Sequence, residues 1–354
     1  MRKILITHRI EELAQKYDEL LHDRTQFEHS GAYFEPIKRI ENLWREFGTD
    51  SIPIREKVVD DDGIESEVIP ADRKKLTRYL YNIYARLDAG LASKPPSVLI
   101  KEAEGLDKIV DKDGIKRVFS INGSAFSSLK DIINDRLQYP MVRKWIFTKF
   151  IGQIGFKTCV YCNSQYTITD EHDRGYYQLD HWLPQSKYPY LSICFFNLYP
   201  CCGSCNRMKN NDDENKYACI YAEESSEDME LYRFSIEVGS LARYILTHDV
   251  NQLKIDFEAA GDEYVIKPLK EKLFMDDLYH QFKDTAEDVV WKRMAYDKGY
   301  KESLSKARLD FVGRANISRF ILGTYDKDED VHKRPLTKLT QDVARQLGVI
   351  EVKL

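Results

Sequence analysis

The chain has 354 residues, 31% of them charged and 43% hydrophobic, which is typical of a globular protein with room for two or three domains. Its formal net charge of −5 excludes a strongly cationic protein, so any contact with nucleic acid depends on local basic patches. No apolar run approaches the length of a membrane span or a signal-peptide core, and the seven cysteines are an odd number, which argues against a secreted disulfide scaffold and favours the cytoplasm.

The N-terminal part, residues 1–150, is expected to be mostly helical. Apolar side chains recur at helical spacing in two stretches, with a polar, acidic loop around residues 60–63 between them. A third helix is expected from about Ser124, and Pro140 should end or kink it. The apolar positions of these helices are Ile37, Ile40, Trp44, Leu76, Leu80, Ile83, Leu87, Leu129, Ile133 and Leu137.

The C-terminal part, residues 217–354, is expected to be mostly helical with a few strands. Residues 231–236 and 253–257 alternate as strands do, and a last helix is expected from about Pro335 to a stop at Gly348. Residues 292–319 carry eight bases against three acids, which suits either a surface that contacts a nucleic-acid backbone or an ordinary charged helix exterior.

The most informative stretch runs from residue 158 to residue 211 and contains six of the seven cysteines. Two Cys-x-x-Cys pairs, Cys159 with Cys162 and Cys202 with Cys205, have the spacing of zinc knuckles, and two such turns complete a tetrahedral thiolate site. Redox pairs, disulfides and unbound thiols are weaker interpretations, because no thioredoxin-like context surrounds the pairs and a cytoplasmic setting disfavours disulfides.

The remaining cysteines are expected to play no part in this site. Cys201 lies next to Cys202, but the two-residue spacing to Cys205 favours Cys202 as the ligand. Cys194 and Cys219 are expected to be core thiols.

The insert between the two cysteine pairs carries candidate catalytic groups. Asp180 and His181 end a strand-like stretch, and neighbouring side chains on a strand point to opposite faces, so the two could flank a phosphate. Asn206 and Asn210 lie four residues apart on a helix expected to open at Ser204. Asp180 with one or both amides would offer oxygen ligands, which suit Mg²⁺ or Mn²⁺ better than Zn²⁺.

This ordered pattern resembles the HNH endonuclease family. The motifs that carry the resemblance are Cys159 with Cys162, Asp180-His181 with Pro184, Asn197-Leu198, and Cys202 with Cys205, Asn206 and Lys209. The resemblance covers about residues 155–212. It implies an α+β fold in which a small ββα-metal HNH core, within residues 151–216 and stapled by the zinc site, is embedded between mostly helical flanks, 1–150 and 217–354.

The resemblance also implies a role for each matching residue. His181 is expected to be the general base, Asp180 a metal ligand, and Asn197 the residue that holds the loop between two strands by hydrogen bonds to its backbone. Asn206 occupies the final metal position, where many members of the family have histidine, so metal preference is open. The candidate contacts to nucleic acid are Lys209, Arg207 and Lys187.

The implied activity is hydrolysis of phosphodiester bonds with a structural Zn²⁺ and a catalytic Mg²⁺ or Mn²⁺, on DNA in preference to RNA. HNH cores within helical flanks also resemble effector nucleases of bacterial anti-phage defence, including the Septu type, which pairs with an ATPase; an ATPase or another defence protein is therefore the expected partner. The alternative is a non-catalytic zinc module that binds nucleic acid or protein, which would need neither the Asp180-His181 pair nor Asn197.

Overall fold

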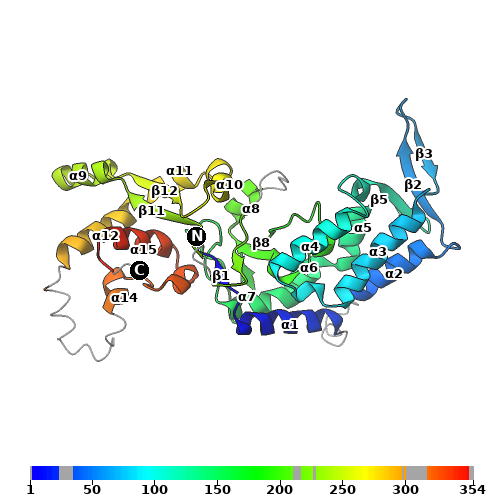
Figure 1. The fold of residues 1–354 in the computed structure, drawn as a ribbon, viewed down its shortest axis with the longest axis horizontal. Coiled ribbons are helices and arrows are strands. Elements are labelled where there is room, and N and C mark those ends of the chain that lie inside the picture. The colour runs from blue at the N-terminus through cyan, green and yellow to red at the C-terminus, as the bar shows by residue number, and fades with distance from the viewer. Residues whose placement is uncertain are drawn as a thin grey trace. The chain divides into compact units, whose positions relative to one another are not determined.

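The computed structural model describes residues 2–23, 35–209, 217–225, 229–296, 299 and 317–350 (Figure 1). These residues form helices together with small sheets, so the predicted α+β class is confirmed. The chain divides into two compact units. Unit 1 contains Met1–Leu5, Ile151–Gln178 and Pro200–Leu354, and unit 2 contains Ile6–Phe150 and Leu179–Tyr199.

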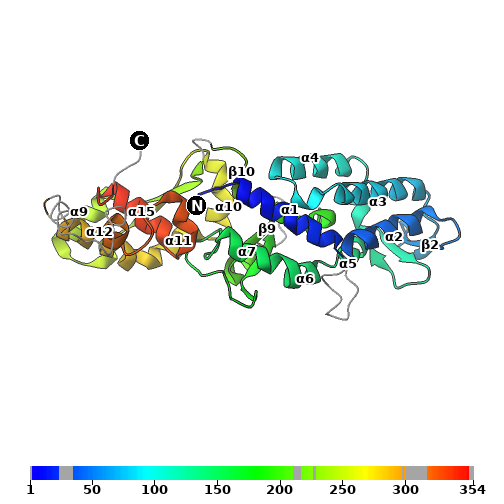
Figure 2. The same ribbon diagram turned by 90° about the horizontal axis from the view of Figure 1, so that it is seen from below.

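Unit 2 is mainly helical, and its helices α2 and α3 lie side by side (Figure 1, Figure 2). Apolar side chains at helical spacing form its core, as the sequence predicts. Its helices are α1 (His8–His22), α2 (Pro36–Gly48), α3 (Arg73–Asp88), α4 (Pro96–Asp107), α5 (Leu129–Leu137) and α6 (Tyr139–Val142), followed by a π-helical turn (Arg143–Phe147) and the first residues of α7 (Thr148–Ile154). Short 3₁₀ turns are Leu91–Ser93, Gly114–Lys116, Pro189–Leu191 and Phe195–Asn197.

The ends of α5 show why one predicted boundary was wrong. The helix begins after Ser128, whose hydroxyl accepts a hydrogen bond from the Asp131 amide at 3.2 Å, and not at Ser124. Gln138 ends the helix with a left-handed backbone, φ +51°. Pro140 lies in the first turn of α6, so the predicted break at this proline is confirmed.

A four-stranded antiparallel sheet in unit 2 was not predicted. Its strands lie in the order β3 (Glu65–Val68), β2 (Ile54–Val59), β4 (Val118–Ile121), β5 (Ser127–Ser128). The acidic segment expected to be a loop is the turn between β2 and β3. Arg117 braces the base of this hairpin, with ion pairs to Glu56 at 2.6 Å and to Asp72 at 2.7 Å.

An aromatic cluster is buried in unit 2. The ring of Tyr17 on α1 lies 5.4–5.7 Å from the rings of Phe147, Phe150 and Phe195. The Tyr17 hydroxyl donates a hydrogen bond of 2.6 Å to the carbonyl of Ile193. The loop that follows the Asp180-His181 pair is therefore anchored on the helical core of its own unit.

Unit 1 combines short strands with a C-terminal helical layer, which consists of Lys283–Ala295, Ile317–Leu322, Asp328–Lys333 and Thr337–Gln346. β11 (Tyr232–Ile236) pairs antiparallel with β12 (Ile255–Ala259), which confirms the two predicted strands. Its other strands are β1 (Ile4–Leu5), β6 (Ile168–Thr169), β7 (Gly175–Tyr176) and β10 (Tyr221–Ala222). Its helices are α8 (Gly203–Lys209), α9 (Val238–Thr247), α10 (Lys267–Glu271), α11 (Met275–Tyr279), α12 (Lys283–Ala295), α14 (Ile317–Leu322) and α15 (Thr337–Gln346), with 3₁₀ turns Val250–Gln252, Glu263–Val265, His280–Phe282 and Asp328–Lys333.

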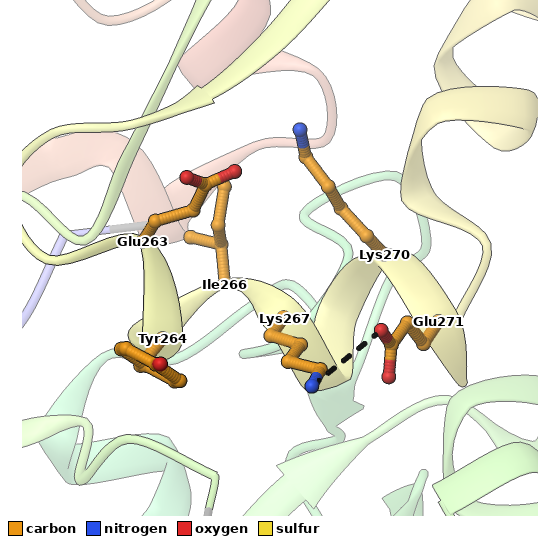
Figure 3. Close-up of a pocket in the computed structure, with 6 residues that line it drawn as sticks. All are labelled: Glu263, Tyr264, Ile266, Lys267, Lys270 and Glu271. Carbon is orange, nitrogen blue, oxygen red and sulfur yellow. Dashed lines mark ion pairs between the residues drawn. The ribbon is translucent and has the colours of Figure 1, made fainter.

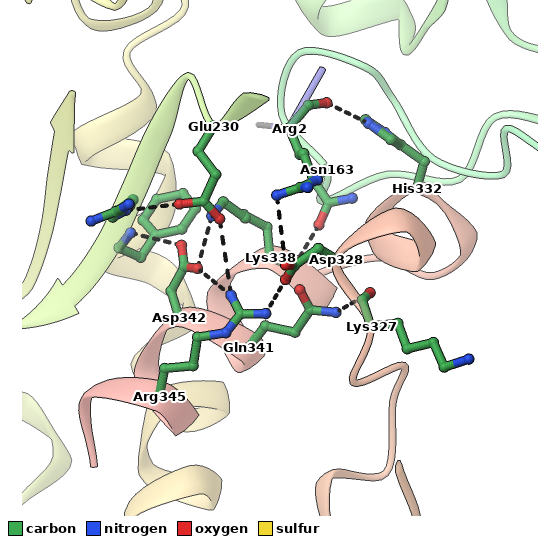
Figure 4. Close-up of polar contacts among 12 residues, drawn as sticks. Arg2, Asn163, Glu230, Lys327, Asp328, His332, Lys338, Gln341, Asp342 and Arg345 are labelled. Atoms are coloured by element: carbon green, nitrogen blue, oxygen red, sulfur yellow. Dashed lines mark hydrogen bonds and ion pairs between the residues drawn. The ribbon is translucent and has the colours of Figure 1, made fainter. Parts of the chain in front are cut away.

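Side chains of helix α15 form hydrogen bonds with backbone groups on the edge of β11 that does not pair with β12. Asp342 accepts a hydrogen bond from the Phe234 amide at 3.0 Å, and Gln346 bonds both backbone groups of Ile236 at 2.8 Å. Lys338, 1% exposed, pairs with Asp342 at 2.8 Å and with Glu230 at 3.1 Å (Figure 4). The last helix is thus the predicted one, but its buried face is largely polar, and Gly348 follows it with φ +66° as expected.

Two further strands contain the boundary between the units. β8 (Gln178–His181) and β9 (Leu198–Cys201) form a two-stranded sheet, and α8 follows β9 in the chain.

Among the described residues, no helix combines the length and the apolar character needed to cross a membrane.

Candidate active site

Four cysteine side chains of unit 1 converge on one point. The Sγ atoms of Cys159, Cys162, Cys202 and Cys205 all lie within 4.8 Å of one another. A zinc ion bound by four thiolates places the sulfurs about 3.8 Å apart, so this donor set fits a tetrahedral zinc site with only a small contraction. The predicted clustering of the two Cys-x-x-Cys pairs is confirmed, and in the described part of the chain no other group of three His, Cys, Asp or Glu side chains is arranged to hold a metal ion.

The sulfurs of Cys162 and Cys202 accept hydrogen bonds from backbone amides and a hydroxyl. The amide and hydroxyl of Ser164 donate to Cys162 Sγ at 3.5 and 3.2 Å, and the Cys205 amide donates to Cys202 Sγ at 3.4 Å. Hydrogen bonds from Cys159 and the other cluster thiols lower the pKa of Cys202, whereas burial raises the pKa of Cys159. Such donors favour thiolates and orient metal ligands.

Cys201 and Cys194 are placed as expected, whereas Cys219 is not a fully buried core thiol. Cys201 is fully buried and its sulfur contacts the Gln178 carbonyl at 3.6 Å, so Cys202 is the member of the cluster, as predicted. Cys194 is buried in unit 2, and burial raises the pKa of its thiol. Cys219 is half-buried, and all seven cysteines are free of disulfides.

Asn163, which the sequence analysis did not single out, fixes the first cysteine turn. This residue is 2% exposed and has φ +51°. Its Nδ2 donates to Thr158 Oγ1 at 3.0 Å and to the Val331 carbonyl at 2.9 Å, while its Oδ1 accepts from the Lys338 amide at 3.1 Å. The cysteine turn is therefore held by the C-terminal layer of unit 1, a contact between residues too distant in sequence to leave a local pattern (Figure 4).

His181 and Asp180 are consecutive on β8, and the histidine is anchored in unit 2. His181 Nε2 donates a hydrogen bond of 3.0 Å to the carbonyl of Ser192, because a carbonyl can only accept. The ring of Tyr139, on α6, lies 4.7 Å from the His181 ring at an interplanar angle of 58°. Asp180 is 9% exposed and His181 is half-buried.

Asn197 closes the loop that starts at β8. It is fully buried, and its Oδ1 accepts from the Leu183 amide at 2.7 Å. Its Nδ2 donates to the carbonyls of Leu183 at 3.2 Å and Leu191 at 3.0 Å, and its own carbonyl accepts from the Trp182 amide at 3.0 Å. One side chain therefore ties both ends and the middle of this loop together.

Asn206 lies on α8, directly after the last cysteine. Its Nδ2 donates a hydrogen bond of 2.7 Å to Gln178 Oε1, which directs the Asn206 Oδ1 away from that contact. Gln178 is two residues before Asp180 on the same strand, so the strand period could have suggested it as a site residue. Asn210, the second predicted amide ligand, lies outside the described residues.

The three residues predicted to contact nucleic acid, Lys187, Arg207 and Lys209, differ in how exposed they are. Arg207 is exposed on α8 and Lys187 is half-buried with its ammonium 4.9 Å from the Tyr188 ring. Lys209 is only 5% exposed, and its ammonium lies 5.1 Å and 5.8 Å from the rings of Tyr217 and Tyr161. Most of the predicted basic segment 292–319 lies outside the described residues.

The predicted site residues thus form two sets. Unit 1 holds the four cysteines with Asn206, Arg207 and Lys209, and unit 2 holds Asp180, His181, Lys187 and Asn197. The sequence analysis missed Tyr139, Ser192 and Asn163; a backbone carbonyl such as that of Ser192 has no signature in a sequence.

A surface pocket of 430 Å³ in unit 1 contains none of these residues (Figure 3). It is lined by the turn before α10 and by α10 itself, with Tyr264 78% exposed. Lys267 and Lys270 face Glu263 and Glu271, and Lys267 pairs with Glu271 at 3.9 Å. The balanced charges do not favour a phosphate site.

Comparison with known proteins bears on the segment that contains the cysteines. Residues 159–213 match the family described as HNH endonuclease. The Septu protein PtuB of Bacillus thuringiensis is 38% identical over 62 residues, which is 18% of this chain and 23% of that relative, so the match spans less than a quarter of the relative's length. No solved structure matches the chain. Residues 159–213 therefore belong to the HNH endonuclease family.

Proposed function

We propose that the protein is a metal-dependent HNH endonuclease that hydrolyses phosphodiester bonds in DNA, with β8, β9 and α8 as its ββα-metal core. The observation that carries the proposal is the hydrogen bond from His181 Nε2 to the Ser192 carbonyl. In the neutral ring, a proton on Nε2 leaves Nδ1 unprotonated, and this is the form that a general base needs.

Zinc is the proposed structural metal, held by Cys159, Cys162, Cys202 and Cys205. The fit rests on four sulfurs within 4.8 Å of one another and on the N–H and O–H donors around them. In this role the ion performs no chemistry. It fixes the start of α8, and with it Asn206, to the first cysteine turn.

A second, catalytic divalent ion is proposed at Asp180 and Asn206, with Asn210 as a further candidate. Carboxylate and amide oxygens suit Mg²⁺ or Mn²⁺. When bound, this ion would supply charge stabilisation at the scissile phosphate and at the leaving 3′ oxygen. Because Nδ2 of Asn206 donates to Gln178, the amide oxygen of Asn206, which is the better ligand atom, points away from Gln178.

The side chains divide the remaining work. His181 takes a proton from the attacking water, and Asn197 keeps the loop that carries the Ser192 acceptor closed. Arg207 and Lys187 are proposed phosphate contacts. Lys209 keeps this assignment only as a proposal, because its ammonium is buried against two tyrosine rings.

The biological setting is proposed from the relative's name and from the family resemblance. The similarity to the Septu protein PtuB supports a role in a Septu-type system. Bacterial anti-phage defence, a cytoplasmic location and a partner such as an ATPase are proposed from the family resemblance. DNA is favoured over RNA only by the family resemblance.

Replacement of His181 by alanine tests the proposal. Cleavage of plasmid DNA with Mg²⁺ or Mn²⁺ should fall by about 10²- to 10⁴-fold, the usual effect of losing a general base. Zinc content and circular dichroism should stay unchanged. His172→Ala, at an exposed histidine of unit 1, is the matched control and should cleave at the parental rate.

Two outcomes would contradict the proposal. Undiminished cutting by His181→Ala would reject the assignment of the base. If the parental protein binds DNA or RNA but cleaves neither with any divalent metal, even with its native partner, the non-catalytic zinc module becomes the better interpretation.

A further inference from the structure

The β2–β3 hairpin of unit 2 lacks a core of its own. Every residue from 57 to 69 is exposed, including the large apolar side chains of Val59 at 59%, Ile64 at 62% and Ile69 at 63%. In Figure 1 the hairpin extends beyond the helices α2 and α3 of its own unit. Isolated two-stranded hairpins are at best marginally stable in water, so thirteen consecutive exposed residues in this form call for an explanation.

The strand register separates the two faces of the hairpin. Val58 pairs with Ser66, and Val68 pairs with Glu56, so Val58 and Val68 lie on one face. The Asp60 amide donates to the Ile64 carbonyl at 3.1 Å, which continues the ladder and puts Ile64 on that face as well. The opposite face carries Lys57, Val59, Glu65 and Glu67. One face therefore carries the apolar strip of Val58, Ile64 and Val68 beside Ser66 and Asp60, and the other face is mostly charged.

Both edges of the outer half of the hairpin are open within the described residues. β4 pairs with β2 only at residues 54–57, and β3 has β2 as its one neighbour in the sheet order. On the same face, Ile54 is buried at the inner end of β2, and so is Glu56, whose carboxylate pairs with Arg117. An open strand edge beside an apolar strip is a common site for another chain to add to a sheet.

Charge decides which kind of partner fits this hairpin. Residues 57–69 contain five acids and one base, a net charge of −4. Three of the acids, Asp60, Asp61 and Asp62, lie at the turn. A nucleic-acid backbone would be repelled, and a second copy of the chain would bring the same acidic residues against one another.

We propose that residues 57–69 form a docking arm for a different protein, one that presents an extended, basic segment with apolar side chains. The partner's strand pairs with one of the two open edges. Its apolar side chains contact Val58, Ile64 and Val68, and its lysines or arginines face the acidic turn. This inference does not depend on the proposed nuclease activity.

A pair of synthetic peptides tests the arm in the full-length protein. The first is a ten-residue peptide of alternating lysine and valine, and the second replaces each lysine by glutamate. The lysine peptide should bind by calorimetry and should protect residues 57–69 from hydrogen exchange, whereas the glutamate peptide should do neither. A DNA duplex should leave residues 57–69 unprotected.

Matched variants separate strand docking from general charge attraction. Val58→Ser with Ile64→Ser and Val68→Ser keeps the net charge and should weaken binding of the lysine peptide at least tenfold. Val59→Ser, on the opposite face, should leave it unchanged. Asp60→Asn with Asp61→Asn and Asp62→Asn should weaken binding and reduce its salt dependence.

Four results would overturn the proposal. The lysine peptide could leave residues 57–69 unprotected, or the two peptides could bind equally well. Sedimentation could also show a dimer of the parental protein that is lost in the Val58, Ile64 and Val68 variant, which would make a second copy the occupant. Protection of the arm by the DNA duplex would likewise reject a protein partner.

Discussion

Residues 159–213, the segment that matches the HNH endonuclease family, are divided between the two units, and each unit holds its part by a different kind of contact. In unit 1 the first cysteine turn is tied to the C-terminal layer by buried polar groups, above all Asn163, with the paired Lys338 and Asp342 next to it. In unit 2 the loop behind His181 is anchored on aromatic packing, with Tyr17 and Phe195 at its centre. Buried polar groups are costly when a partner is lost, whereas aromatic packing tolerates changes of charge.

The difference implies that the units respond to different perturbations. Metal removal, acid and loss of an amide should act on unit 1, because its bonds depend on protonation and on hydrogen-bond partners. A change of ring packing should act on unit 2. Hydrogen exchange reports each unit separately and allows the comparison to be tested.

The largest effect is expected from loss of the proposed zinc. Cys202→Ala should release the metal and unfold the cysteine region of unit 1, because a structural zinc contributes about 10 kcal/mol to folding in small zinc modules. Metal analysis and hydrogen exchange measure both. Cys201→Ala, at the buried neighbour, should keep the metal and cost about 1 kcal/mol. Equal loss of hydrogen-exchange protection in residues 8–150, which belong to unit 2, would contradict the proposed difference between the units.

A smaller effect is expected from Asn163→Ala. It removes the three side-chain hydrogen bonds that join Asn163 to the buried residues Thr158, Val331 and Lys338, so unit 1 should lose about 4 kcal/mol. Urea denaturation measures the loss. Asn122→Ala is the matched control, since Asn122 is exposed and has φ +50°; it should cost only about 1 kcal/mol of backbone strain. Similar losses for both variants would assign the effect to strain.

Acid should destabilise unit 1 through His332. Burial lowers the pKa of His332 to about 4 from 6.5, and its Nδ1 is buried without a hydrogen-bond partner among the described residues. The unfolded chain binds this proton first, so the contribution is complete above pH 6.5 and is lost as the pH falls from 6.5 to about 4, by about 3 kcal/mol.

The His332→Gln variant isolates this contribution. The glutamine amide can still donate to the Arg2 carbonyl that accepts from His332 at 3.0 Å, but it does not titrate. Unfolding measured between pH 4 and pH 7 should therefore depend less on pH than in the parent. His248→Gln, at an exposed histidine of the same unit, should keep the parental dependence. An unchanged profile for His332→Gln would remove His332 as the cause.

The smallest effect is expected from Tyr139→Ala in unit 2. Loss of the ring that packs on His181 should lower kcat of the proposed cleavage about tenfold, equivalent to about 1.4 kcal/mol, and leave KM unchanged. Tyr139→Phe keeps the ring and should restore the rate. Zinc content should not change in either variant. A Phe variant as slow as the Ala variant would show that the hydroxyl, not ring packing, is what matters.

Local patterns predicted much of this molecule. The cysteine spacing identified the four clustered thiols, and alternation identified β11 and β12. The β2–β3 hairpin was missed because its apolar strip faces solvent and its turn residues, Asp60 to Gly63, read as an acidic loop. The support of His181 could not be predicted, since a backbone carbonyl eleven residues away and a ring forty-two residues away leave no periodic signal.

The division of the chain between the units has a consequence for any attempt to dissect the protein. The backbone passes from one unit to the other four times, after residues 5, 150, 178 and 199. Cleavage at one passage splits the chain into two fragments, and no single cut separates unit 1 from unit 2, because unit 1 contains three segments of the chain and unit 2 contains two. A fragment ending at residue 150 would lack the Ile193 carbonyl that accepts from Tyr17, and a fragment starting at residue 151 would lack Tyr17 itself. The two units are therefore expected to be inherited, expressed and degraded as one polypeptide, with neither dispensable for the other.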